Sequence, residues 1–252
     1  MFEIREKVIL VTGGGGALCG QIAAALADYG ALVYVLDLAF PKQKEEISKN
    51  LFQIECDVTD GNKFRTLCKD IFSKHGRIDV LVNGAGVVYT KKDSELYPKE
   101  EWDKALAVNL TAPFVCSQIA FEYMVKNKKG SIINITSLAA ERGFPNNPAY
   151  CASKGGLRVL TKSFARDWGE SGIRVNNIVP GYMGAGMTGE TYKDESIRKF
   201  RAALTMLGRW GSPEDLIGPV IFLASDASSY ITGADIHVDG GWLANGLPKQ
   251  VT

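Results

Sequence analysis

Three side chains that can transfer a proton or stabilise a charge lie close together in this sequence: Ser137, Tyr150 and Lys154. Tyr150 and Lys154 are four residues apart, so on a helix they lie one turn apart on the same face. Ser137 follows the apolar run 131–136, and the polar loop after it is long enough to return the chain beside that run. A hydroxyl, a phenol and an ammonium can therefore meet at one substrate oxygen. The pattern predicts proton transfer at an alcohol or a ketone.

Tyr150 can serve as a base near neutral pH only if its pKa is lowered, because a free tyrosine has a pKa of about 10. An ammonium about 4 Å away, at an intermediate dielectric, stabilises the phenolate by about 4 kcal/mol, which is about three pKa units. We therefore expect Lys154 to lower the pKa of Tyr150, and Ser137 to hydrogen-bond the reacting oxygen. Each residue also has a plainer interpretation: a serine that caps a turn, a tyrosine that packs its ring and a surface lysine.

The elements that must position these residues follow a regular alternation. Short β-branched runs, typical of strands buried on both faces, alternate with segments of helical spacing along the whole chain. We expect an α/β fold, a Rossmann-like doubly wound parallel sheet with helices on both faces, in a single domain over residues 1–252. The predicted strands are 7–12, 31–37, 51–56, 78–83, 131–136, 173–179 and 236–239, and the predicted helices are 18–29, 61–75, 101–126 and one from about 149.

Composition narrows the class of protein. The 252 residues carry a net charge of +1, which gives no electrostatic footprint for nucleic acid or an acidic membrane. No apolar run is of transmembrane length and the N-terminal residues lack a signal-peptide pattern, so we expect a soluble cytoplasmic protein. The five cysteines are scattered and form no C-x-x-C pair, which argues against a disulfide framework and against zinc. We expect no metal.

A glycine-rich turn, Gly13–Gly16, connects the first predicted strand to the first predicted helix. This arrangement binds a pyrophosphate at the helix N-terminus, although a tight turn without a ligand is the alternative. Asp37 closes the second predicted strand, where a carboxylate can accept both ribose hydroxyls and would repel a 2′-phosphate. Lys42 and Lys44 are near in sequence but are interpreted as solvated. The sequence predicts NAD in preference to NADP.

Taken in order, these motifs resemble those of the short-chain dehydrogenase/reductase family over nearly the full length of the chain. The family's T-G-x-x-x-G-x-G pattern begins at Thr12, but Ala17 and Cys19 replace its second and third glycines. Its N-N-A-G motif corresponds to residues 83–86 with Gly84 in place of the second asparagine. The threonine that usually follows the motif at 180–181 is Ala185 here, so Thr188 or backbone groups would have to substitute for it.

The resemblance implies specific roles. Asn109, Ser137, Tyr150 and Lys154 match the family's catalytic set, in which the asparagine holds a water that links the lysine to solvent; a plain backbone hydrogen bond is the alternative for Asn109. Lys154 would also hold the nicotinamide ribose. The residues expected to bind the cofactor are Gly13, Gly16, Ala17, Leu18, Asp37, Asp57, Val58, Asn83, Ala85, Gly86, Tyr150, Lys154, Pro180, Gly181, Met183 and Thr188.

The segment 182–208 is rich in glycine and methionine and is expected to form a mobile lid over the substrate. Arg142, Asn147 and Met187 are candidate substrate contacts. Arg142, Asn146 and Asn147 favour a polar, anionic substrate, with a solvated loop residue as the alternative for Arg142. By resemblance we expect a sugar acid or polyol, as in gluconate-type dehydrogenases. The resemblance also implies a homotetramer that assembles through the last strand and the helices holding Asn109 and Tyr150, with core packing as the alternative use of those surfaces.

Two other functions remain open. A β-ketoacyl carrier-protein reductase shares the tyrosine and lysine, but it would normally prefer NADP and show a basic patch for its acidic carrier. A catalytically silent NAD-binding sensor can use the same fold. The intact Ser137, Tyr150 and Lys154 argue against the sensor, while Ala17, Cys19 and Ala185 favour it.

Overall fold

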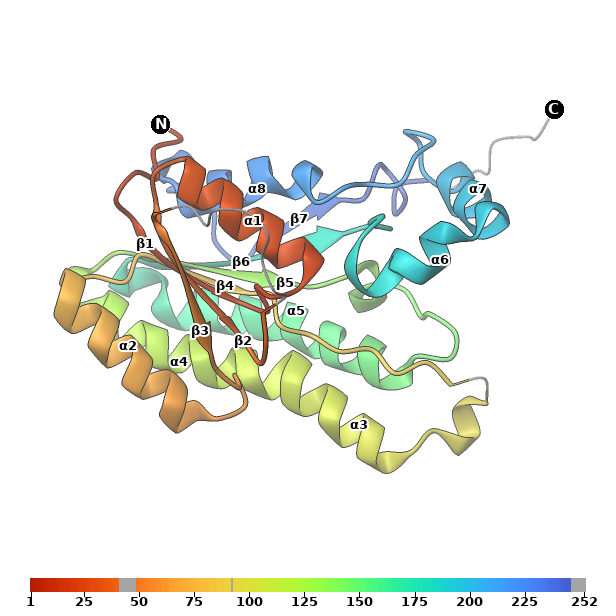
Figure 1. Cartoon of the computed structure of the whole chain (residues 1–252), viewed down its shortest axis with the longest axis horizontal. Coiled ribbons are helices and arrows are strands. Elements are labelled where there is room, and N and C mark those ends of the chain that lie inside the picture. Colours follow the sequence, from red (N-terminus) through yellow and green to blue (C-terminus); the bar gives the residue numbers. More distant parts are fainter. Residues whose placement is uncertain (41–48, 92, 246–252) are drawn as a thin grey trace.

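The computed structural model describes residues 1–40, 49–91 and 93–245. Seven parallel strands form one sheet in the order β3-β2-β1-β4-β5-β6-β7 (Figure 1). The order reverses between β1 and β4, and this is where a crevice opens at the carboxyl edge of such sheets. The predicted Rossmann-like fold is confirmed. The strands are β1 Val8–Thr12, β2 Leu32–Asp37, β3 Leu51–Glu55, β4 Val80–Asn83, β5 Gly130–Ile135, β6 Ile173–Pro180 and β7 Asp235–Val238.

Helices cover both faces of the sheet, with α1 and α8 on one face and α2, α4 and α5 on the other (Figure 1). Alternate residues of each strand therefore enter different cores: Ile9 and Val11 pack with α1 and α8, whereas Val8 and Leu10 pack with α2 and α4. Burial on both faces explains why the strands are continuous apolar runs. The helices are α1 Ala17–Asp28, α2 Gly61–His75, α3 Lys99–Leu106, α4 Ala112–Met124, α5 Pro148–Trp168, α6 Gly189–Lys193, α7 Glu195–Ala203 and α8 Glu214–Ala224.

The predicted helix 101–126 is interrupted. A π-helical turn, Ala107–Thr111, separates α3 from α4 and contains Asn109. The whole stretch Lys99–Asn127 is long and apolar enough, by length and composition, to cross a membrane, which differs from the expectation that no run would qualify. In this fold 44% of its most apolar window is buried, and α4 packs against α2 and the sheet. These are the properties of a core helix.

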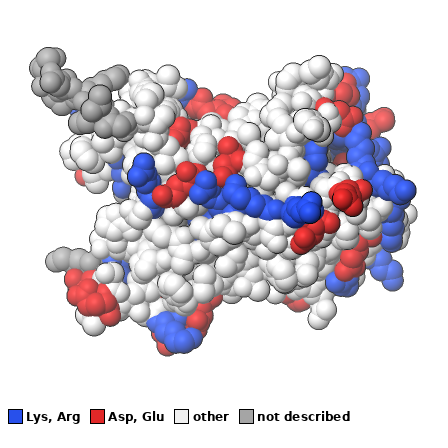
Figure 2. Space-filling model, turned by 180° about the vertical axis from the view of Figure 1, so that it is seen from behind, with Lys and Arg blue, Asp and Glu red and all other residues white. Residues whose placement is uncertain are grey.

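Charges of both signs are interspersed on the surface. On the face seen in Figure 2, a row of lysine and arginine side chains has acidic side chains beside it, and wide uncharged areas adjoin the row. Ion pairs such as Arg158 and Lys162 with Asp235, each at 2.9 Å, join opposite charges. This face presents no large field of one sign.

Candidate active site

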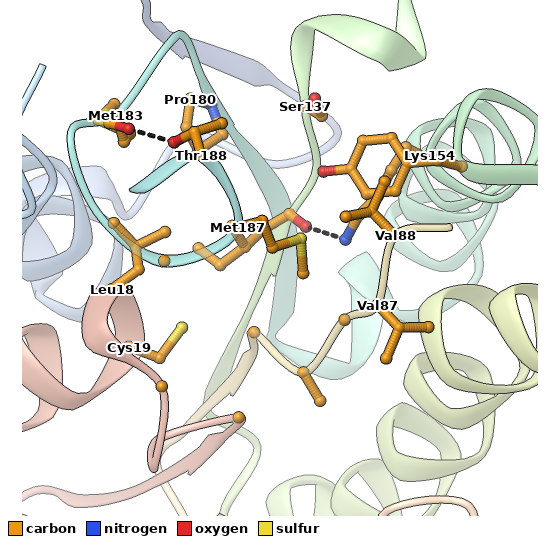
Figure 3. A pocket seen from close by; sticks show the side chains of 18 of the residues that line it. Leu18, Cys19, Val87, Val88, Ser137, Lys154, Pro180, Met183, Met187 and Thr188 are labelled. Carbon is orange, nitrogen blue, oxygen red and sulfur yellow. Dashed lines mark hydrogen bonds between the residues drawn. The ribbon is translucent and has the colours of Figure 1, made fainter. Parts of the chain in front are cut away.

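A cavity of about 550 Å³ lies along the carboxyl edge of the sheet. Its lining runs from Asp37, at the end of β2, past the loops after β1 and β4, to Tyr182 after β6. Figure 3 shows side chains from α1, from the loop after β4 and from the segment after β6 pointing into it. Of the residues predicted to bind cofactor, all except Asn83 line this cavity: Gly13, Gly16, Ala17, Leu18, Asp37, Asp57, Val58, Ala85, Gly86, Tyr150, Lys154, Pro180, Gly181, Met183 and Thr188.

The glycine turn has the conformation that a phosphate cradle requires. Gly13 has φ +74°, and a Cβ there would lie 2.6 Å from the Ala85 Cα, so a side chain is excluded by both conformation and space. Gly16 precedes α1 as its N-cap and supplies no side-chain cap. The first N–H groups of α1 thus have no side-chain acceptor at the cavity wall. This geometry fits a dinucleotide pyrophosphate.

The adenosine end of the cavity carries two carboxylates. Asp37 accepts hydrogen bonds from the Gly15 N–H at 2.9 Å and the Leu38 N–H at 2.7 Å, which fixes its orientation. Asp57 accepts from the Thr59 hydroxyl and N–H, and these bonds lower the pKa of Asp57. Across the described residues, the cations that line the cavity are Lys154 and Arg201, and neither follows β2 or β3. Lys42 and Lys44 lie outside the described residues.

The structure brings Ser137, Tyr150 and Lys154 together. Thr136 follows the end of β5, and Ser137 comes next. Tyr150 lies in the first turn of α5, with Lys154 one turn later. Ser137 lies close enough to Tyr150 to lower the pKa of its phenol, and the Ser137 Oγ accepts from the Ala139 N–H at 3.2 Å. The Lys154 Nζ donates to the Ile135 carbonyl at 2.8 Å and lies 5.8 Å from the centroid of the Tyr150 ring (Figure 3). All three side chains face the cavity.

Electrostatics at this site differ from the sequence-based expectation. Burial raises the pKa of Tyr150, and the neighbouring Ser137 side chain offsets only part of that rise. Burial also lowers the pKa of Lys154 to about 8. Because the cavity wall removes water from both groups, the cost of burying each charge exceeds their mutual stabilisation. The predicted net lowering of the Tyr150 pKa is therefore not found.

Asn109 and Asn83 are buried beneath the cavity wall. The Asn109 side chain accepts from the Val87 N–H at 2.8 Å and donates to the Val87 carbonyl at 2.9 Å and the Ser153 hydroxyl at 3.2 Å. It thereby ties the loop after β4 to α5, and these contacts match the alternative of a plain backbone hydrogen bond. Asn83 donates to Asn134 at 2.8 Å and does not line the cavity.

The two ends of the segment after β6 are held next to each other by backbone hydrogen bonds. The Gly184 N–H donates to the Gly211 carbonyl, and the Gly211 N–H donates to the Tyr182 carbonyl, both at 2.9 Å. Between them the chain forms α6 and α7 (Figure 1), and Met187, Thr191 and Arg201 of this segment line the cavity. Thr188 donates its hydroxyl to the carbonyls of Met183 and Ala185, so that hydroxyl is bonded within the segment.

Two of the three predicted substrate contacts line the cavity, and the third does not. Asn147 lines the cavity and accepts from the Thr90 hydroxyl at 2.9 Å, and Met187 extends across the cavity toward Lys154 (Figure 3). Arg142 is exposed and lies outside the lining. Arg201, on α7, lines the cavity instead, and the sequence reasoning did not single it out. One feature of the sequence could have indicated Arg201: it is an arginine of the proposed lid with aromatic residues nearby in the same segment.

Comparison with known proteins agrees with this geometry. A family model described as Enoyl-(Acyl carrier protein) reductase matches residues 16–243. The chain is 38% identical over 248 residues to the 2-dehydro-3-deoxy-D-gluconate 5-dehydrogenase of Bacillus subtilis (strain 168), covering 96% of this chain and 97% of that protein. It is 34% identical to the 5-keto-D-gluconate 5-reductase of Escherichia coli (strain K12), covering 96% and 98%. The 3-oxoacyl-[acyl-carrier-protein] reductase of Thermotoga maritima is 35% identical, with coverage of 95% and 98%.

Solved structures give the same grouping. The ligand-free aldohexose dehydrogenase of Thermoplasma acidophilum superposes with a TM-score of 0.90 at 30% identity, covering 99% of this chain and 98% of that one. A gluconate 5-dehydrogenase from Burkholderia cenocepacia, in complex with NADP and tartrate, superposes with a TM-score of 0.88 at 29% identity, covering 96% and 97%. With a family model that matches residues 16–243 and relatives above 30% identity over nearly the whole chain, this protein belongs to the short-chain dehydrogenase/reductase family of oxidoreductases.

Proposed function

We propose that this protein is an NAD-dependent dehydrogenase that interconverts a secondary alcohol and a ketone on a sugar acid. The observation that carries the proposal is that Ser137, Tyr150 and Lys154 line the same cavity as the glycine turn and Asp37. The proton-transfer groups and the dinucleotide cradle thus share one space. The names of the relatives support a sugar acid as substrate.

The chain's own residues handle the proton. During oxidation, the Tyr150 phenolate accepts the proton of the substrate O–H group, and during reduction the phenol returns it to the carbonyl oxygen. Ser137 donates a hydrogen bond to the same oxygen as charge develops there. Lys154, whose Nζ lies 5.8 Å from the centroid of the Tyr150 ring, would hold the nicotinamide ribose. A bound nicotinamide dinucleotide supplies or accepts the hydride.

The preference for NAD rests on Asp37. Its carboxylate lines the adenosine end of the cavity, where it can accept from ribose hydroxyls and would repel a 2′-phosphate. Three similar structures are described with NADP, and a cofactor titration distinguishes the two preferences. Fluorescence titration should give tighter binding of NADH than of NADPH. The variant Asp37→Ala should lose most of this difference, and equal affinities in the unmodified protein would refute the preference.

A substrate screen tests the reaction. Sugar acids, polyols, simple ketones and a β-ketoacyl thioester are compared by absorbance at 340 nm with each cofactor. Turnover of a sugar acid supports the proposal. Turnover of the thioester with NADPH would instead support a 3-oxoacyl carrier-protein reductase, which the Thermotoga maritima relative represents. Tight NADH binding without turnover of any substrate would indicate a catalytically silent sensor.

We further propose that the protein is a cytoplasmic homotetramer. The exposed faces of α4 and α5 carry apolar side chains, among them Phe114 and Val159, which is 64% exposed. Phe114 stacks on Phe164 with a centroid distance of 5.8 Å, which makes that face rigid and aromatic. Analytical ultracentrifugation should give the mass of four chains, and Val159→Asp should lower it. Trp242, by contrast, packs within the chain on Phe144 at 5.8 Å.

A further inference from the structure

Arg201 is a cation at the substrate end of the cavity that no carboxylate of the described chain neutralises. It lies on α7 and lines the cavity with Tyr182 and Thr191, on the β6 side where the Ser137 hydroxyl also faces the space. The two carboxylates that line the cavity, Asp37 at the end of β2 and Asp57 after β3, lie at the other side of the sheet's reversal point. Arg201 is thus the lining cation on the side of the cavity that holds no lining carboxylate.

Two other arginines of the described chain have carboxylate partners. Arg209 pairs with Asp215 at 2.7 Å, and Arg77 pairs with Asp79 at 2.6 Å. Arg201 has no such ion pair within the described residues; its Nη1 donates to the Thr191 hydroxyl at 3.1 Å. A half-buried guanidinium without a carboxylate partner keeps N–H donors and a positive charge available for an anionic ligand.

Aromatic rings hold the Arg201 guanidinium in place. Its central carbon lies 4.5 Å from the centroid of the Tyr182 ring and 5.6 Å from that of Trp210. Trp210 is itself fixed, because it is buried and its indole N–H donates to the Arg198 carbonyl at 2.8 Å. These cation–π contacts and the hydrogen bond from Nη1 to Thr191 restrict the guanidinium, and they leave Nε and Nη2 as donors for a planar acceptor. This arrangement is preorganised for two parallel hydrogen bonds.

We propose that Arg201 binds the carboxylate of the substrate and so selects sugar acids over neutral sugars and polyols. The inference rests on the proposed function, since it names the residue that recognises the acid group. It replaces Arg142, which is exposed and outside the cavity, as the anion-binding side chain. Segment 184–210 thereby delivers a specificity residue to the cavity, because the backbone hydrogen bonds of Gly211 with Tyr182 and Gly184 fix where it leaves and returns.

The test compares binding of two ligands that share one carbon chain, D-gluconate and D-glucitol, to protein saturated with NADH. By calorimetry, Arg201→Gln should weaken D-gluconate binding by roughly 10- to 100-fold, the range expected for a charged hydrogen-bonded pair. D-glucitol binding should change less than about threefold by the same criterion. Arg201→Lys keeps the charge but loses the planar guanidinium. Its affinity for D-gluconate should lie between that of the unmodified protein and that of Arg201→Gln.

A matched control comes from the same helix. Arg198 stacks on Tyr192 at 5.5 Å but does not line the cavity, so Arg198→Gln should leave both ligands unaffected. Thermal unfolding of each variant verifies that it is folded. Unchanged D-gluconate affinity in Arg201→Gln, or equal weakening of both ligands, would overturn the inference. Weaker NADH binding in that variant would mean that Arg201 serves a cofactor phosphate, and would also overturn it.

Turnover separates this inference from the proposed function. If Arg201-dependent D-gluconate binding is observed but no sugar acid is oxidised, the proposed function fails and the role of Arg201 stands. If sugar acids are oxidised equally well by Arg201→Gln, the function stands and the inference fails. Absence of any D-gluconate binding to the unmodified protein likewise overturns the inference.

Discussion

The thiol of Cys19 occupies the space beside Gly84: a Cβ built on Gly84 would lie only 2.2 Å from the Cys19 Sγ. The two positions are far apart in sequence, and in the related motifs they hold a glycine and an asparagine. Here the larger residue is on α1 and the smaller one follows β4. The two departures from the family pattern therefore compensate for each other across the crevice, and Cys19 is buried as a result.

This relationship predicts a coupled pair of mutations. Gly84→Ala should lower the free energy of unfolding by about 1–3 kcal/mol, because the added methyl overlaps the thiol. The double variant Cys19→Ala/Gly84→Ala should be at least about 1 kcal/mol more stable than the sum of the single changes predicts. Rescue will be partial, since the same Cβ lies 2.9 Å from the Thr12 carbonyl oxygen.

Urea unfolding of the four proteins measures the coupling. Gly143→Ala is the control, because a Cβ at Gly143 meets nothing within 4 Å. It should change stability by less than about 0.5 kcal/mol. Additive effects of the Cys19 and Gly84 changes would show that the two departures are independent.

Much of the fold and site could be predicted, because strands buried on both faces leave a continuous apolar signal and the site residues follow those strands. Asp37 ends β2 and Ser137 comes shortly after β5, and their positions come directly from the pattern. Arg201 could not be placed in this way: its location depends on how segment 184–210 folds back over the cavity, which no periodicity records. The pKa of Tyr150 was mispredicted for a related reason, since spacing gives proximity to Lys154 but not the burial that outweighs it.

Removing the Tyr150 hydroxyl should abolish proton transfer without removing the cofactor site. Tyr150→Phe should lower kcat by about 100- to 10,000-fold, the usual contribution of a positioned acid or base. The affinity for NADH, measured by fluorescence titration, should change only slightly. Turnover close to that of the unmodified protein would exclude Tyr150 as the proton-transfer group.

Asn109 should affect the cofactor site through the loop after β4. Asn109→Ala leaves the Val87 N–H and carbonyl without their partner, and should cost about 2–4 kcal/mol of unfolding free energy. It should also raise the KM for the cofactor, because residues 86–88 line the cavity. Asn176→Ala is the matched control: this buried asparagine bonds to Ile231 and Ala234, away from the cavity. It should lose stability without a change in KM, and a similar KM change in both variants would refute a specific role for Asn109.

Lys154 should make stability depend on pH in the alkaline range. Its pKa is about 8 in the folded protein, because of burial, against 10.5 for an exposed lysine. Between these values the unfolded chain binds the proton and the folded chain does not, so stability rises as pH rises from about 8 to 10.5. Lys154→Met removes this contribution. Its free energy of unfolding, relative to the unmodified protein, should fall by about 2–3 kcal/mol from pH 7 to pH 10.5. Lys154→Met also loses the hydrogen bond to the Ile135 carbonyl, which changes the free energy of unfolding by an amount that does not vary with pH. Lys104→Met, at an exposed position on α3, is the control and should show no such pH dependence. If the free energy of unfolding of Lys154→Met, relative to the unmodified protein, also stays constant with pH, burial does not depress the pKa of Lys154.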